Sequence, residues 1–168
     1  MTPAWARRRW LLAFALAVLL GGCAGDTFLV KQVSYTAPNP PAAGETMIYV
    51  FREDNALAAA RQLEIIDNDT VVAVLTTATF SHFTVPSGEH EIVGYISPSP
   101  IVHYRVTAAP GKTVYLLCRI GYTSGMFMEV LDEAQAKPLM AKFKYTEIGV
   151  KGVKAKMDYK AYYDKLYK

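Results

Sequence analysis

Short runs of strand-forming residues recur through the middle of the chain, and turn residues separate them at intervals of about ten residues. The clearest runs are apolar, β-branched and aromatic, and they cover 47–52, 70–75 and 113–120. The turn sequences between runs are Asp67-Asn68-Asp69, Pro86-Ser87-Gly88 and Ala109-Pro110-Gly111-Lys112. No long helical pattern separates the runs, which disfavours a parallel α/β sheet. The pattern predicts an all-β fold, an antiparallel sandwich of about seven or eight strands between Thr46 and Leu131.

The turn sequences also predict local geometry. Residues 67–69 tolerate turn conformations and are expected to close a hairpin. Residues 86–88 have proline and glycine where a type I turn prefers them, which predicts a second hairpin with His90 near Val85. Gly111 follows a proline at the centre of a predicted type II turn, because glycine readily takes the positive φ that this turn requires.

A short helix and a basic tail are predicted after the last strand. Asp132 is a suitable N-cap for a helix over about 133–142, although Pro138 weakens it. Residues 143–168 are rich in lysine and tyrosine, and apolar side chains recur there at helical spacing at Tyr159, Tyr162, Tyr163 and Leu166. We therefore predict a sandwich domain over 46–142 and a helical tail over 143–168.

Residues 1–22 have the parts of an export signal. Three arginines precede an apolar run over 11–20, which is too short for a membrane-spanning helix of about 20 residues. The sequence Leu20-Gly21-Gly22-Cys23 then resembles the lipobox of bacterial lipoproteins. This resemblance implies cleavage between Gly22 and Cys23, a diacylglycerol thioether on the Cys23 sulfur and an acyl chain on its amine. An uncleaved anchor or an ordinary secretory signal is the alternative.

The lipobox also implies a location. Ala24 and Gly25 follow Cys23, and the absence of aspartate there resembles the outer-membrane sorting of proteobacterial lipoproteins. We therefore expect a lipid-anchored protein on the periplasmic face of the outer membrane. Residues 23–45 contain a proline-rich stretch and are predicted to form a tether, with 28–33 able to dock as an edge strand.

The balance of charge argues against a nucleic-acid partner. The full chain carries 18 basic and 15 acidic residues, but three arginines belong to the signal, so the mature chain is neutral. Residues 142–168 hold eight lysines and three acidic residues, whereas 23–141 hold seven basic and twelve acidic residues. This asymmetry predicts that the tail either docks on the acidic body or contacts an external polyanion.

Three basic residues are candidates for a contact with the cell wall or with an anion. The ending Lys165-Leu166-Tyr167-Lys168 resembles that of Braun-type murein lipoproteins, whose last lysine is joined to peptidoglycan. Lys165 and Lys168 are the wall contacts of this alternative, and a solvated or docked basic helix is the other interpretation. Arg52 stands at the end of a predicted strand, where it could bind an anion or form a structural salt bridge.

No catalytic or metal-binding pattern stands out. The chain has no glycine-rich phosphate loop, no zinc-spaced cysteine pair and no Gly-x-Ser-x-Gly motif, so we predict no cofactor and no metal. Cys118 lies in an apolar run, which favours a buried thiol over a nucleophile. His82, His90 and His103 are expected to be surface or turn residues. The sequence predicts a protein that is not an enzyme, and the alternative is an enzyme that joins Cys118 to a distant histidine.

Four segments carry a resemblance to a known family. They are Ile48–Arg52, Val85–His90, Ala109–Tyr115 and Met128–Ala134. They resemble an uncharacterised bacterial lipoprotein family, domain of unknown function 2846, over about 46–142. The resemblance implies a small periplasm-facing β-sandwich similar to carbohydrate-binding or transthyretin-like modules, and it implies no known activity. We therefore expect a cell-envelope lipoprotein that binds or scaffolds a protein or glycan partner.

Overall fold

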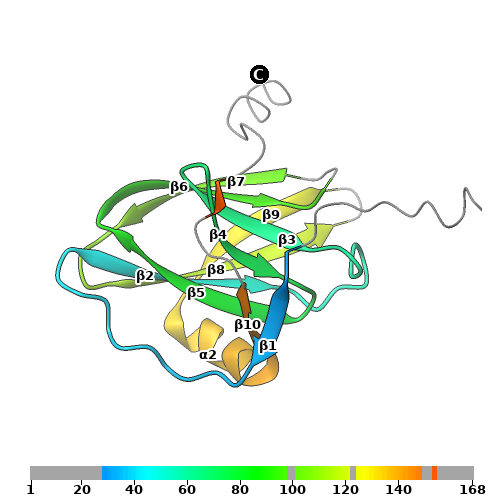
Figure 1. The fold of residues 1–168 in the computed structure, drawn as a ribbon, viewed down its shortest axis with the longest axis horizontal. Helices are drawn as coiled ribbons and strands as arrows, with labels where there is room; N and C mark the ends of the chain where they lie inside the picture. Colours follow the sequence, from blue (N-terminus) through cyan, green and yellow to red (C-terminus); the bar gives the residue numbers. More distant parts are fainter. Residues whose placement is uncertain (1–27, 98–100, 122–123, 149–152, 155–168) are drawn as a thin grey trace, which may run out of the picture.

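The computed structural model describes residues 28–97, 101–121, 124–148 and 153–154, which form a sandwich of two β-sheets with one short helix (Figure 1). The predicted β-rich sandwich is confirmed in outline. The strands are β1 Val30–Val33, β2 Glu45–Arg52, β3 Leu63–Asp67, β4 Thr70–Leu75, β5 Thr79–Pro86, β6 Gly88–Tyr95, β7 Ile101–Ala108, β8 Thr113–Gly121, β9 Gly125–Leu131, β10 Lys144–Ile148 and β11 Val153–Lys154. The helix, α2, covers Glu133–Lys142. No helix in these described ranges is long and apolar enough to span a membrane.

Six strands form one sheet, in the order β1-β10-β5-β2-β8-β9. This sheet is mixed, because β2 runs parallel to β8 and β10 runs parallel to β5. The prediction of a purely antiparallel sandwich is therefore wrong, since the chain leaves this sheet after β2 and later returns beside it in the same direction. Hydrogen bonds from Gly111 N to Glu45 O (2.8 Å) and from Met47 N to Lys112 O (3.0 Å) align the starts of β2 and β8. Gly111 has the predicted positive φ, 67°.

The other sheet has the order β11-β4-β3-β6-β7, and each of its pairs is antiparallel. β3 and β4 form the predicted hairpin, with Asn68 and Asp69 at φ values of 43° and 66° in its turn. The predicted hairpin at 86–88 is wrong, because β5 belongs to one sheet and β6 to the other. The backbone turns a corner there: Gly88 has a φ of 143°, and Ser87 N donates to Gly44 O (2.8 Å).

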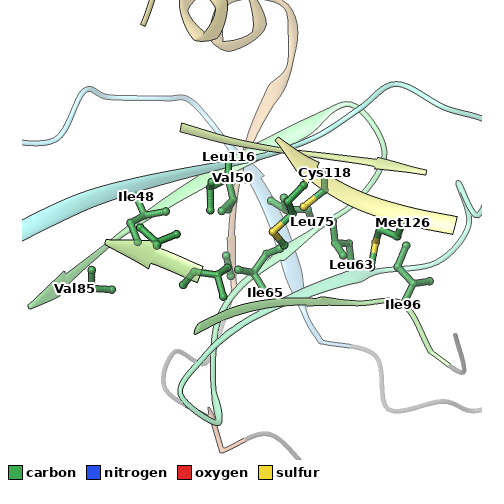
Figure 2. Packing of buried hydrophobic residues seen from close by; sticks show 14 of the residues in the cluster. Ile48, Val50, Leu63, Ile65, Leu75, Val85, Ile96, Leu116, Cys118 and Met126 are labelled. Carbon is green, nitrogen blue, oxygen red and sulfur yellow. The ribbon is translucent and has the colours of Figure 1, made fainter. Parts of the chain in front are cut away.

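Apolar side chains between the two sheets form the main core (Figure 2). The central strand β2 is buried on both of its faces. Ile48 and Val50 pack into this core, whereas Tyr49 and Phe51 belong to a second cluster on the outer face of the six-stranded sheet. That second cluster also contains Ala136 of α2, so the helix covers this outer face. Burial on both faces explains why the sequence of β2 is almost continuously apolar.

The helix α2 forms where its local signals predicted it. The Asp132 carboxylate accepts a hydrogen bond from Gln135 N (2.8 Å), and Gln135 Oε1 accepts one from Asp132 N (2.9 Å). This reciprocal capping box satisfies two donors at the helix start. Pro138 lies inside the helix without ending it. The helix ends at Lys142, and Phe143 then turns the chain into β10.

The sandwich extends beyond the predicted boundaries at 46 and 142. β1, from the predicted tether, pairs antiparallel with β10, from the predicted tail. Docking of the 28–33 segment as an edge strand is thereby confirmed. The prediction of helix throughout 143–168 is wrong over Lys144–Ile148, where Tyr145, Thr146 and Ile148 are buried strand residues. The predicted helix over 154–168 lies outside the described residues, apart from Lys154 at the end of β11.

Candidate functional site

A cleft of about 470 Å³ lies between α2 and the edge of the six-stranded sheet. Strands β8 and β9 supply one wall and α2 supplies the other, and the residues after β2 close one end. The residues that line it are Glu53, Asp54, Leu117, Arg119, Glu129, Leu131, Gln135, Leu139, Lys142 and Phe143. We call this feature the α2 cleft. Its size is within the usual range for a binding site for a small molecule or for a few side chains of a partner.

The α2 cleft combines an apolar part with a charged part. The apolar side chains are those of Leu117, Leu131, Leu139 and Phe143. The charged residues are three acids and two bases, so the lining carries a formal charge of one negative unit. The lining therefore presents an apolar wall beside charges of both signs.

Arg119 is the central cation of the α2 cleft. Its Nε and Nη2 atoms donate to Glu129 Oε1 at 3.1 Å and 2.8 Å, and its Nη1 lies 3.6 Å from Glu53 Oε2. The hydrogen bond to Glu129 raises the pKa of Arg119, and the charge of Glu53 adds to this effect. The guanidinium side chain is still 40% exposed, so a ligand has access to it.

Glu53 is held in place by the protein rather than by solvent. Its Oε1 accepts hydrogen bonds from Ile120 N and from Asn55 Nδ2. Its own main-chain N donates to Cys118 O (3.1 Å), which fastens the end of β2 to β8. The other carboxylate oxygen faces Arg119. The acidic end of the α2 cleft is thus rigid before any ligand binds.

The charged groups of the α2 cleft are largely paired within the protein. Its lining contains no serine, cysteine or histidine, and its charged side chains are those of Glu53, Asp54, Arg119, Glu129 and Lys142. Arg119 engages Glu53 and Glu129, amides also engage Glu53, and Asp54 Oδ2 lies 4.0 Å from Lys142 Nζ. The α2 cleft therefore combines paired charges with an apolar wall.

No family model, no curated protein and no solved structure matches this chain. The resemblance to the uncharacterised lipoprotein family therefore stays a prediction.

Several predicted site residues lie outside the described part of the chain. Gly22 and Cys23 belong to the segment before residue 28, and Lys165 and Lys168 belong to the segment after residue 154. The structure thus places Arg52 alone among the residues predicted to contact an anion or the wall.

Arg52 is buried inside the fold. Its side chain is among the largest that are fully buried, and burial lowers its pKa. Nη1 donates to the carbonyls of Arg61 (2.6 Å) and Leu75 (3.2 Å), and Nη2 donates to the carbonyl of Ala58 (2.6 Å). Arg52 therefore fastens the loop between β2 and β3 to the end of β4. Its described partners are carbonyls, in place of the carboxylate that a structural salt bridge would supply.

Cys118 is buried in the main core, as predicted. Burial raises the pKa of its thiol to about 12, while the nearby charge of Arg52 acts in the opposite direction. A thiol in this environment is protonated at neutral pH and is a poor nucleophile.

The three histidines occupy separate places, and His90 differs from the expected surface position, whereas His82 and His103 are half-buried. His90 is buried, with Nδ1 2.9 Å from Asp67 Oδ1 and Nε2 2.8 Å from Pro86 O. His103 Nε2 lies 3.4 Å from Glu91 Oε2. Within the described residues, no three side chains of histidine, cysteine, aspartate or glutamate are grouped to hold a metal ion.

His82 belongs to a row of aromatic rings that crosses the outer face of the six-stranded sheet. The rings of Tyr115, Tyr49, His82 and Tyr145 follow one another on four adjacent strands, with 5.3 Å between neighbouring centroids. Tyr35 packs against this row, and its hydroxyl lies 2.9 Å from that of Tyr49. Burial raises the pKa of Tyr145 to about 12. Because the rings face one another, the row is packing rather than an open platform for a sugar.

The sequence pattern indicated neither the α2 cleft nor the aromatic row. Arg119 and Glu129 are on paired strands and face the same side of the sheet, where the register places Arg119 opposite Phe127. A correct prediction of the β8–β9 hairpin register would have found this ion pair. Glu53 comes from far along the chain, and no local signal indicated its position.

Proposed function

We propose that this protein is a lipid-anchored protein of the bacterial cell envelope and that its sandwich is a non-catalytic binding module. In this proposal Cys23 carries the lipid and the sandwich faces the periplasm from the outer membrane. The α2 cleft is the binding site. It receives a segment of an envelope protein that joins an apolar side chain to a basic group.

The α2 cleft is the observation that carries the binding role. It pairs an apolar wall with a rigid acidic end, and its lining has one more acid than bases. The buried thiol of Cys118 and the engagement of His90 by Asp67 are consistent with a module that binds without catalysis. The lipobox resemblance at Leu20–Cys23 supports the anchor, since several acyl chains hold a protein stably on a membrane.

Cys23→Ser is expected to release the protein from the membrane fraction. Serine lacks the sulfur that would carry the diacylglycerol, while the charged and apolar parts of the export signal are unchanged. The measurement is fractionation of cells that express the wild type or the variant, followed by mass analysis of the N-terminal peptide. Membrane association of the variant at the wild-type level would contradict a lipid anchor.

A photo-cross-linking amino acid at Gln135, inside the α2 cleft, is expected to capture an envelope protein in living cells. The same amino acid at Arg105, an exposed position on the other sheet, is expected to give no such adduct. Glu129→Lys should abolish the adduct at position 135, because it reverses a charge in the lining. Glu89→Lys makes the same change at an exposed position of β6 and should leave the adduct intact.

Mass analysis of the adduct identifies the captured segment. The proposal requires an apolar residue next to a lysine or arginine at the point of cross-linking. Equal adducts at positions 135 and 105, or an adduct at 135 that survives Glu129→Lys, would exclude the α2 cleft as the binding site.

A further inference from the structure

Phe28, which is held by contacts with the sandwich, is only five residues after the predicted lipid anchor at Cys23. The Gln62 side chain clamps the main chain of Phe28 from both sides: Phe28 N donates to Gln62 Oε1 (2.9 Å), and Gln62 Nε2 donates to Phe28 O (2.8 Å). The Phe28 side chain packs against a buried cluster that includes Val71 and Tyr95. These contacts therefore hold Phe28 in place on the sandwich.

This clamp limits how far the sandwich can move from the membrane. Phe28 is the fifth residue after Cys23, and five residues span at most about 18 Å when fully extended. The tether predicted over 23–45 would have allowed the sandwich to lie several times farther from the membrane. If Cys23 is acylated, Phe28, at the start of this edge of the sandwich, is held within about 18 Å of the lipid headgroups.

The edge that is held there exposes apolar side chains. Leu29 is 68% exposed and Val33 is 40% exposed, and both are among the most exposed large apolar residues of the described chain. Lys31 and Val33 point to one side of β1, because successive strand residues point to opposite sides, and Leu29 directly precedes the strand. Lys31 is exposed between the two apolar side chains. An ammonium group flanked by aliphatic side chains suits the boundary between headgroups and acyl chains.

We infer that the β1 edge, formed by Leu29, Lys31 and Val33, rests on the phospholipid surface and fixes the orientation of the anchored sandwich. This inference rests on the proposed lipid anchor at Cys23. In Figure 1, β1 is the blue strand beside β10 at one end of the six-stranded sheet. β9 forms the opposite edge of the same sheet, so we expect it to lie farther from the membrane than β1 does.

The mature chain offers a clean fluorescence test, because both tryptophans, Trp5 and Trp10, lie in the predicted signal. Leu29→Trp places a single fluorophore on the β1 edge. Phe127→Trp places one on β9, where the native side chain is a large apolar residue with 39% exposure. Both variants are purified as the lipidated mature protein and reconstituted on vesicles of phosphatidylethanolamine and phosphatidylglycerol, with and without brominated acyl chains.

We expect a blue shift on vesicles and a loss of intensity with brominated lipid for Leu29→Trp, and neither change for Phe127→Trp. Val33→Trp repeats the readout if substitution at Leu29 disturbs the clamp on Phe28. Equal quenching at both edges would overturn this inference but not the proposed anchor. The same holds if neither edge is quenched while the protein still floats with the vesicles. A blue shift of Leu29→Trp without vesicles would also overturn it, since a second copy of the chain would then cover the edge. Failure to float would overturn the proposed anchor and this inference together.

Discussion

Arg52→Ala is expected to lower the free energy of unfolding by about 3–5 kcal/mol, from the lost hydrogen bonds of a charged donor and from the cavity that its side chain leaves. The substitution leaves the carbonyls of Ala58, Arg61 and Leu75 without their guanidinium donor and leaves an empty volume in a fully buried position. The loss is a large part of the typical total stability of about 5–15 kcal/mol. Chemical denaturation of the soluble Cys23→Ser protein, with and without the substitution, measures it.

Arg119→Ala is the matched control for this measurement. Arg119 is also an arginine of the six-stranded sheet, but its side chain is 40% exposed and its closest ion pair is with the exposed carboxylate of Glu129. Its removal is expected to cost at most about 1 kcal/mol, as for other exposed ion pairs. Equal losses for the two variants would mean that the carbonyl contacts of Arg52 contribute no special stability. The loss of unfolding free energy for Arg52→Lys should lie between the losses for the two alanine variants. An ammonium group cannot reproduce the planar set of N–H donors of a guanidinium group.

The thiol of Cys118 is expected to react with a thiol reagent roughly a thousand-fold more slowly than an exposed cysteine at pH 8. Its pKa of about 12 leaves very little thiolate at that pH, and the side chain is fully buried. In the Cys23→Ser protein Cys118 is the single thiol, since the chain has two cysteines. The labelling rate is measured in native buffer and in denaturant, where the difference should disappear.

Thr107→Cys in a background of Cys23→Ser and Cys118→Ala supplies the exposed reference on β7. As the pH rises from 7 to 10, labelling at position 107 should level off above its ordinary pKa of about 8.5. Labelling of Cys118 should continue to rise over the same range, because its pKa is higher. A native Cys118 that reacts within tenfold of the reference, roughly, would instead support the alternative of a catalytic cysteine.

Local signals in the sequence predicted the elements that depend on local contacts. The helix α2 follows from the cap at Asp132, and the β3–β4 hairpin follows from turn residues that tolerate positive φ. The corner at 86–88 has the same residue types as a hairpin turn, and only the pairing of β5 with β2 and of β6 with β3 distinguishes the two. Pairing with strands that are distant in the sequence therefore determines whether residues 86–88 form a corner between sheets or a hairpin turn.

The difference between local and long-range contacts also explains why the candidate site was not predicted from the sequence. The α2 cleft joins Glu53 after β2, Arg119 on β8 and Lys142 at the end of α2, which are distant in the sequence. Arg52 was expected to bind an anion or to form a salt bridge, but it is buried against carbonyls, two of which lie in a loop whose conformation no motif predicted. Burial of Cys118 could be predicted, because a single apolar run determines it.

The parallel pairings have a consequence for the order in which the chain can fold. β2 needs β8 beside it, and β5 needs β10, so the middle of the six-stranded sheet is incomplete until almost the whole sequence is free to pair. Such long-range pairing is slow, because the entropy of closing large loops must be overcome before the contacts form. If the chain is exported as proposed, slow closure would be an advantage, since its early strands would reach the export channel before their partners are available.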